Sequence, residues 1–235
     1  MAENLESNES LSSQIKKSII EKNLDTGLDY AELGLDSFIA DGVLKEIPIV
    51  KTIMGFAGTG LKIKEAFFAK KILTFLSTFH AGKLSDEKMV DFRIRMEDDQ
   101  KYREEVLEIV MVYIDRFMEV KQAEIFANLF QAHLNGRIEW DFLRTLLFSL
   151  QQLNVGALPE LVKISEQAAK SANTRGFVIE MHAPNTYISA LVAAGLGQQV
   201  GNYVKGNRAA FFLYRYGILA DINYELTVDQ AKNMN

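Results

Sequence analysis

Residues 47–79 read IPIVKTIMGFAGTGLKIKEAFFAKKILTFLSTF, an apolar stretch broken by glycines that predicts a helical protein. Residues 43–73 carry six lysines and two glutamates, a net charge of +4, within a chain whose net charge is −5. A local excess of lysine on apolar helical sequence favours contact with an anionic membrane surface or an acidic partner. The same pattern fits a buried hairpin whose lysines line the solvent side, and the sequence leaves both interpretations open.

The periodicity inside this stretch predicts two helices separated by a hinge. Pro48 can begin the first helix, because the first helical turn tolerates proline. The second helix spans residues 61–79, and we expect Lys62 and Lys70 on the face opposite its apolar stripe. Three glycines weaken the region between the helices, since each destabilises a helix interior by about 1 kcal/mol. The predicted hinge residues are Gly55, Gly58 and Gly60.

The residues expected to contact a membrane or a partner lie in the same two helices. They combine basic side chains with the aromatic side chains between them, as interfacial helices do. The predicted contact residues are Lys51, Lys62, Lys64, Phe67, Phe68, Lys70 and Lys71.

The rest of the chain predicts a mainly α fold, an antiparallel helical bundle with a small C-terminal α+β tail. Only three prolines occur in 235 residues, and apolar residues recur at three-four spacing. Short loops between the helices imply antiparallel neighbours. We expect a disordered N-terminus over residues 1–10, a bundle over 11–172 that includes the basic apolar hairpin 44–79, and a tail over 173–235. Predicted helices besides the hairpin are 11–24, 28–44, 84–99, 102–117, 120–135, 138–153 and 159–172.

The sequence pattern of the tail differs from that of the bundle. Residues 177–182 (FVIEMH) predict a short strand, and residues 185–194 predict a helix. Two β-like runs follow, 196–204 and 208–214, around the turn sequence Lys205-Gly206-Asn207. A helix followed by a hairpin is the outline of a winged-helix module. The few basic residues here favour a wing that contacts protein or completes the core over one that reads DNA.

Composition excludes several function classes. The chain has no cysteine, so disulfides and thiolate metal ligands or nucleophiles are absent, and 48% of its residues are hydrophobic. A net charge of −5 argues against non-specific nucleic-acid binding, and we expect no nucleic-acid partner. No run of about 18 uncharged apolar residues predicts a transmembrane helix, and the polar N-terminus shows no secretory signal. We expect a cytoplasmic protein that associates peripherally with the inner membrane.

No catalytic or metal-binding constellation stands out. Residues 55–62 (GFAGTGLK) do not match a phosphate-binding loop, which needs lysine directly after the second glycine of its motif. His80, His133 and His182 are too far apart in sequence to predict a zinc site or a triad. The acidic residues 97–99 are more typical of a helix N-terminal charge bias than of acid–base chemistry. We predict no catalytic residues, no metal and no cofactor.

Three stretches carry a resemblance to a known family. Residues 41–53 (DGVLKEIPIVKTI) and 63–76 (IKEAFFAKKILTFL) look like a pattern in uncharacterised bacterial helical proteins. Residues 191–196 (LVAAGL), with Tyr216 and Gly217 further on, are similar to the helix–wing endings of proteins related to the abortive-infection alpha family. The resemblance implies bacterial origin and a phage-defence or stress role, and it transfers no catalytic residues.

These observations together predict a non-enzymatic bacterial effector or accessory protein. It would contact a membrane surface or a partner through the basic apolar segment 44–79. The alternative is a soluble oligomeric adaptor or regulator that binds a protein partner through its winged-helix-like tail. We expect a homo-oligomer in either case.

Overall fold

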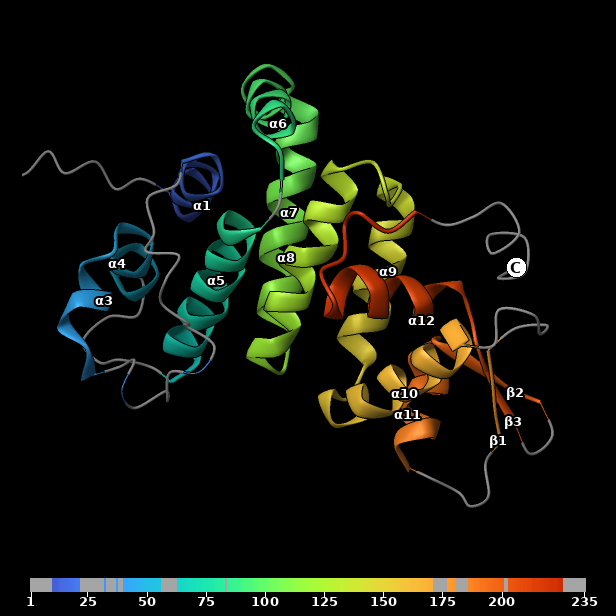
Figure 1. Ribbon diagram of the computed structural model, residues 1–235. Helices are drawn as coiled ribbons and strands as arrows, with labels where there is room; N and C mark the ends of the chain where they lie inside the picture. Colours follow the sequence, from blue (N-terminus) through green and yellow to red (C-terminus); the bar gives the residue numbers. More distant parts are fainter. Residues whose placement is uncertain are drawn as a thin grey trace, which may run out of the picture. The chain divides into compact units, whose positions relative to one another are not determined.

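The protein is mainly helical, with a small antiparallel sheet near the C-terminus, as the sequence predicts (Figure 1). A computed structural model describes residues 10–21, 32, 37, 40–55, 63–82, 84–170, 177–180, 186–200 and 203–225. The chain forms two compact units, unit 1 (Met1–Ala81 and Met89–Asp115) and unit 2 (Gly82–Lys88 and Arg116–Asn235). The chain therefore passes between the units after residues 81, 88 and 115, and no boundary between them falls at residue 173, where the sequence texture changes.

Unit 1 contains the basic apolar segment. Its helices are α1 (Leu11–Ile20), α3 (Gly42–Glu46), α4 (Pro48–Gly55), α5 (Ile63–Ala81), α6 (Asp86–Asp98, from Met89 onward) and α7 (Gln100–Arg116, up to Asp115). Asp41 caps α3, because its carboxylate accepts from the backbone N–H of Val43 at 2.7 Å and of Leu44 at 3.3 Å. Pro48 begins α4 as predicted, and α4 packs against α1, α3 and α5.

Helix α1 is fixed to unit 1 by apolar and polar contacts. Ile15 and Ile19 are completely buried. At its C-terminal end, the Ser18 carbonyl accepts from His80 Nε2 of α5 at 2.7 Å. The Ile20 carbonyl accepts from Arg93 Nε of α6 at 2.8 Å. These contacts satisfy carbonyl groups that a helix C-terminus leaves without an intrahelical partner.

Unit 2 is built around helix α8 (Val120–Leu134), whose apolar face includes the buried Phe126 and Phe130. The side chain of Gln122 bridges two elements. It accepts from the backbone N–H of Glu119 at 2.9 Å and donates to the Leu150 carbonyl of α9 (Trp140–Gln152) at 2.6 Å. A short 3₁₀ turn, η1 (Val155–Ala157), leads into α10 (Leu158–Lys170).

The C-terminal tail departs from the predicted hairpin. Strands β1 (Phe177–Glu180), β2 (Gly197–Val200) and β3 (Tyr203–Gly206) form an antiparallel sheet in the order β1-β3-β2. The predicted strand at 177–182 and the helix at 185–194, observed as α11 (Thr186–Ala193), are confirmed. Lys205 and Gly206 pair within β3 instead of forming the turn, and Gln198 lies opposite Lys205.

The predicted second strand, residues 208–214, is wrong. These residues form α12 (Arg208–Phe212), which continues into a π-helix, η2 (Leu213–Ile218). Asn207 explains the difference, because its side chain accepts from the backbone N–H of Ala210 at 3.1 Å and so caps the helix. The same side chain donates to the Gly195 carbonyl at 2.7 Å. The apolar run that resembles a strand therefore begins as a capped helix.

Candidate membrane-contact surface

The predicted contact residues separate into exposed and buried groups. Lys51 on α4 and Lys64 on α5 are exposed, and Phe67 and Phe68 are half-buried. Lys51 forms an ion pair with Glu46 at 2.7 Å, and this exposed pair contributes little to stability. Lys62 lies outside the described residues. Of the three predicted hinge residues, Gly55 is the last residue of α4, while Gly58 and Gly60 also lie outside the described residues.

Lys70 and Lys71 are buried, which corrects the expectation that Lys70 lies on a solvated face. Only 7% of Lys70 and 3% of Lys71 are exposed. Helix α5 buries nearly its whole circumference between Ala69 and Phe79, so no side of that part is left for solvated lysines. In this conformation neither lysine can touch a membrane, and both belong to the interior of the protein.

Lys71 joins α5 to the end of α7. Its ammonium group donates to the Asp115 carbonyl at 3.0 Å and lies 5.1 Å from the ring centroid of Phe67. Carbonyls in the last turn of a helix lack intrahelical partners and carry partial negative charge, so they favour a cation. Burial nevertheless lowers the pKa of Lys71 to about 8, which the Asp115 charge opposes and the Lys64 charge reinforces. The cost of removing the ammonium from water therefore exceeds the attraction to its partners.

Two strongly exposed apolar side chains accompany the exposed lysines. Val43 on α3 is 77% exposed, and Ile63 at the start of α5 is 70% exposed. Lys45 is also exposed, and neither Lys45 nor Lys64 forms an ion pair within the described part of the chain. We refer to these side chains as the basic apolar surface, which consists of Val43, Lys45, Lys51, Ile63 and Lys64.

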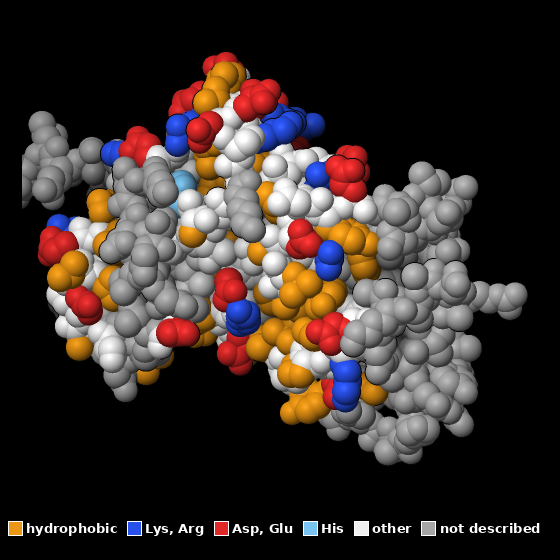
Figure 2. All heavy atoms as spheres, in the orientation of Figure 1, with side chains coloured by type: hydrophobic (Ala, Val, Ile, Leu, Met, Phe, Trp, Pro, Cys, Tyr) orange, Lys and Arg blue, Asp and Glu red, His pale blue; other side chains and the backbone are white. Residues whose placement is uncertain are grey.

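Sequence reasoning did not identify Val43 and Ile63 as surface residues. Both fit the general apolar texture of the segment, and periodicity alone does not place either of them at the surface. Their position next to helix ends is the available signal, since Val43 follows the capping residue Asp41 and Ile63 opens α5. Over α3 and α4, Figure 2 shows apolar side chains interleaved with basic and acidic ones. Apolar and charged side chains are thus mixed on this surface.

The histidines that the structure describes hold backbone groups. His80 bonds the Ser18 carbonyl, and His133 Nδ1 lies 2.7 Å from the Ile138 carbonyl oxygen. His182 lies outside the described residues. Within the described ranges, no three histidine, aspartate or glutamate side chains are grouped so that they could hold a metal ion.

None of the helices that the structure describes combines the length and the apolar character needed to cross a bilayer. Comparisons with protein-family models, with curated proteins and with solved structures find no match for this chain. The case for a function consequently depends on the surface chemistry described above.

Proposed function

We propose that the protein is a non-enzymatic interaction protein that associates peripherally with anionic membranes through the basic apolar surface. The observation that carries this proposal is the exposure of Val43 and Ile63, two of the most exposed large apolar side chains, on the same helices as the exposed Lys45 and Lys64. Apolar side chains at a bilayer interface gain from leaving water, and neighbouring lysines gain from anionic headgroups.

The expected binding is reversible and sensitive to salt. Each lysine near an anionic leaflet contributes about 1 kcal/mol, so Lys45, Lys51 and Lys64 together contribute about 3 kcal/mol. The Glu46 carboxylate lies 2.7 Å from the Lys51 ammonium and reduces the contribution of Lys51 to the binding free energy. Because exposed charges are screened within about 10 Å at 0.1 M ionic strength, salt should weaken the association.

Charge reversal on this surface tests the proposal. We expect Lys45→Glu, Lys51→Glu and Lys64→Glu combined to lower co-sedimentation with anionic vesicles by at least about tenfold. Lys70 and Lys71 stay unchanged, because reversing buried charges would unfold the protein rather than test its surface. The matched control reverses three exposed lysines elsewhere, Lys101, Lys121 and Lys163. Equal loss of binding in both triple variants would contradict a localised surface.

A defence setting is the biological context that we propose for this activity. The support is the resemblance of residues 191–196, with Tyr216 and Gly217, to the helix–wing endings of proteins related to the abortive-infection alpha family. Residues 41–53 and 63–76 add a likeness to uncharacterised bacterial helical proteins. We expect bacteria that express the protein to show reduced phage plating efficiency, and the triple glutamate variant of the basic apolar surface to restore plating. Unchanged plating across a panel of unrelated phages would count against this setting.

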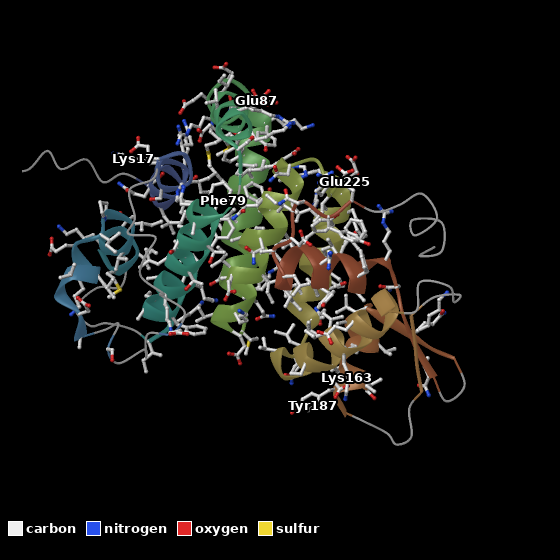
Figure 3. All side chains as sticks on the ribbon, in the orientation of Figure 1. Lys17, Phe79, Glu87, Lys163, Tyr187 and Glu225 are labelled. Atoms are coloured by element: carbon white, nitrogen blue, oxygen red, sulfur yellow. The ribbon has the colours of Figure 1, made fainter. Side chains whose placement is uncertain are left out.

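A soluble adaptor that acts through the winged-helix-like tail is the second candidate. The observation in its favour is the exposure of Tyr187 on α11, at the edge of unit 2 (Figure 3). Exposed tyrosines are enriched in protein interfaces because one flat side chain combines apolar area with a hydroxyl group. Failure of the wild-type protein to bind any anionic vesicle would favour this candidate over the membrane role.

A further inference from the structure

Helix α6 carries an apolar ridge that faces solvent. Val90 is 49% exposed and Ile94 is 54% exposed, and their spacing of four residues places them on one side of the helix. The opposite side is buried through Phe92 and Met96. Helix α6 therefore has two apolar sides, of which the described part of the protein covers only one.

Carboxylates flank this ridge. Glu87 lies three residues before Val90, Asp91 three residues before Ile94 and Asp98 four residues after it, so all share the exposed side. Glu97, by contrast, is engaged by Lys16 at 3.0 Å. Glu87, Asp91 and Asp98 form no ion pair within the described ranges. We refer to Glu87, Val90, Asp91, Ile94 and Asp98 as the acidic ridge, and Figure 3 marks Glu87 on α6.

The acidic ridge and the basic apolar surface have complementary chemistry. Each presents two exposed apolar side chains, and the exposed Asp91 and Asp98 of the ridge are opposite in charge to the exposed Lys45 and Lys64. None of these four side chains forms an ion pair within the described residues, whereas Lys51 is paired with Glu46. In Figure 1, α3 at the left and the part of α6 that belongs to unit 1 at the top lie well apart. A single copy therefore cannot bring its own ridge onto its own basic apolar surface.

We propose that the acidic ridge of one copy docks onto the basic apolar surface of a second copy. Such a contact joins two different surfaces, so it is heterologous and leaves one free surface at each end of the assembly. It extends into a ring or an open chain as copies are added. Since each side offers few apolar groups, the association is weak, reversible and strongest at low salt. The proposal goes beyond the membrane role, because the acidic ridge takes no part in vesicle binding.

Exchanging the charges of the two surfaces tests this pairing. Self-association is measured by sedimentation velocity at low salt over a series of protein concentrations. The wild type should form species larger than a dimer at high concentration. We expect Asp91→Lys with Asp98→Lys to weaken self-association at least about tenfold, and Lys45→Glu with Lys64→Glu to do the same. All four changes in one chain should restore it. Neither ridge substitution reverses charge in the first turn of α6, where carboxylates stabilise the helix.

The controls separate this pairing from general charge effects and from the membrane role. Glu104→Lys with Glu108→Lys reverses two exposed acids on the neighbouring α7 and should leave self-association unchanged. The Asp91→Lys, Asp98→Lys variant should still bind anionic vesicles. A wild type that stays monomeric at its highest soluble concentration overturns the proposal. So does a fourfold variant that does not reassemble, because the two surfaces would then not be partners.

Discussion

The substitution Lys71→Met is expected to stabilise unit 1 by about 1 to 3 kcal/mol at pH 7. The Lys71 ammonium is almost fully buried, and burial lowers its pKa from 10.5 to about 8. Because one pKa unit corresponds to about 1.4 kcal/mol, keeping this group charged opposes folding by about 3 kcal/mol. Methionine has a similar volume and no charge. The Asp115 carbonyl that loses its donor belongs to an exposed residue, so water can replace the ammonium.

The pH dependence of this effect has a definite sign. Between pH 8 and 10.5 the unfolded chain holds a proton on Lys71 that the folded protein has largely lost, so wild-type stability rises with pH in that window. Below about pH 8 the penalty is fully present and constant. The advantage of Lys71→Met should therefore be largest at neutral pH and should shrink toward pH 10. Burial raises the pKa values of Tyr102, Tyr214 and Tyr216, so the variant must be compared with the wild type at each pH.

Urea unfolding followed by circular dichroism at pH 7 and pH 9.5 measures this difference. The control is Lys101→Met, since the Lys101 side chain is exposed and its pairing with Glu105 is long at 3.9 Å. We expect the control to change the free energy of unfolding by less than about 0.5 kcal/mol. A Lys71→Met variant that is less stable than the wild type at pH 7 would mean that the contacts of the ammonium outweigh its burial.

The substitution Gly217→Val is expected to destabilise unit 2 by about 3 kcal/mol or more. Gly217 is buried in the π-helix η2, where a Cβ atom would lie 2.8 Å from Ile125 Cγ2 and 3.4 Å from the Leu129 side chain. The Gly217 carbonyl also accepts from the buried Asn128 amide of α8 at 2.9 Å. Moving the backbone away to make room for valine would therefore break this hydrogen bond.

Tryptophan fluorescence reports on this change directly, because Trp140 is the single tryptophan of the chain and lies in unit 2. Urea unfolding followed at Trp140 should show a much lower midpoint for Gly217→Val. Gly42→Val is the matched control, since a Cβ at Gly42 would meet no atom within 4 Å. Its unfolding is followed by circular dichroism, because Gly42 lies in unit 1. Equal midpoints for the wild type and Gly217→Val would show that α8 and η2 do not pack closely.

The helical part of the fold was predictable because its signal is local. Helices α7, α8 and α9 follow runs of apolar residues at three-four spacing, and the predicted ranges agree with the observed ones to within a few residues. The capping role of Asn207 is also a local signal, because an asparagine before an apolar run is typical of a helix N-cap. The strand prediction for residues 208–214 assigned Asn207 to a turn instead.

The burial of Lys70 and Lys71 was not predictable in the same way. Periodicity ranks the sides of a helix by their apolar content, but α5 is enclosed on nearly all sides. The carbonyl that holds Lys71 belongs to Asp115, 44 residues further along the chain. The candidate contact surface therefore lies at the first residues of α5 and on α3, where Ile63 and Val43 are exposed, and not in the middle of α5.

Partition of the wild-type protein between solution and vesicles tests the central claim most directly. The protein is mixed with anionic or zwitterionic vesicles at low and at high salt, and the bound fraction is measured by co-sedimentation. We expect binding to anionic vesicles at low salt, marked loss of binding at high salt and little binding to zwitterionic vesicles. Absence of binding to anionic vesicles at low salt, or equal binding to both vesicle types, would contradict this claim.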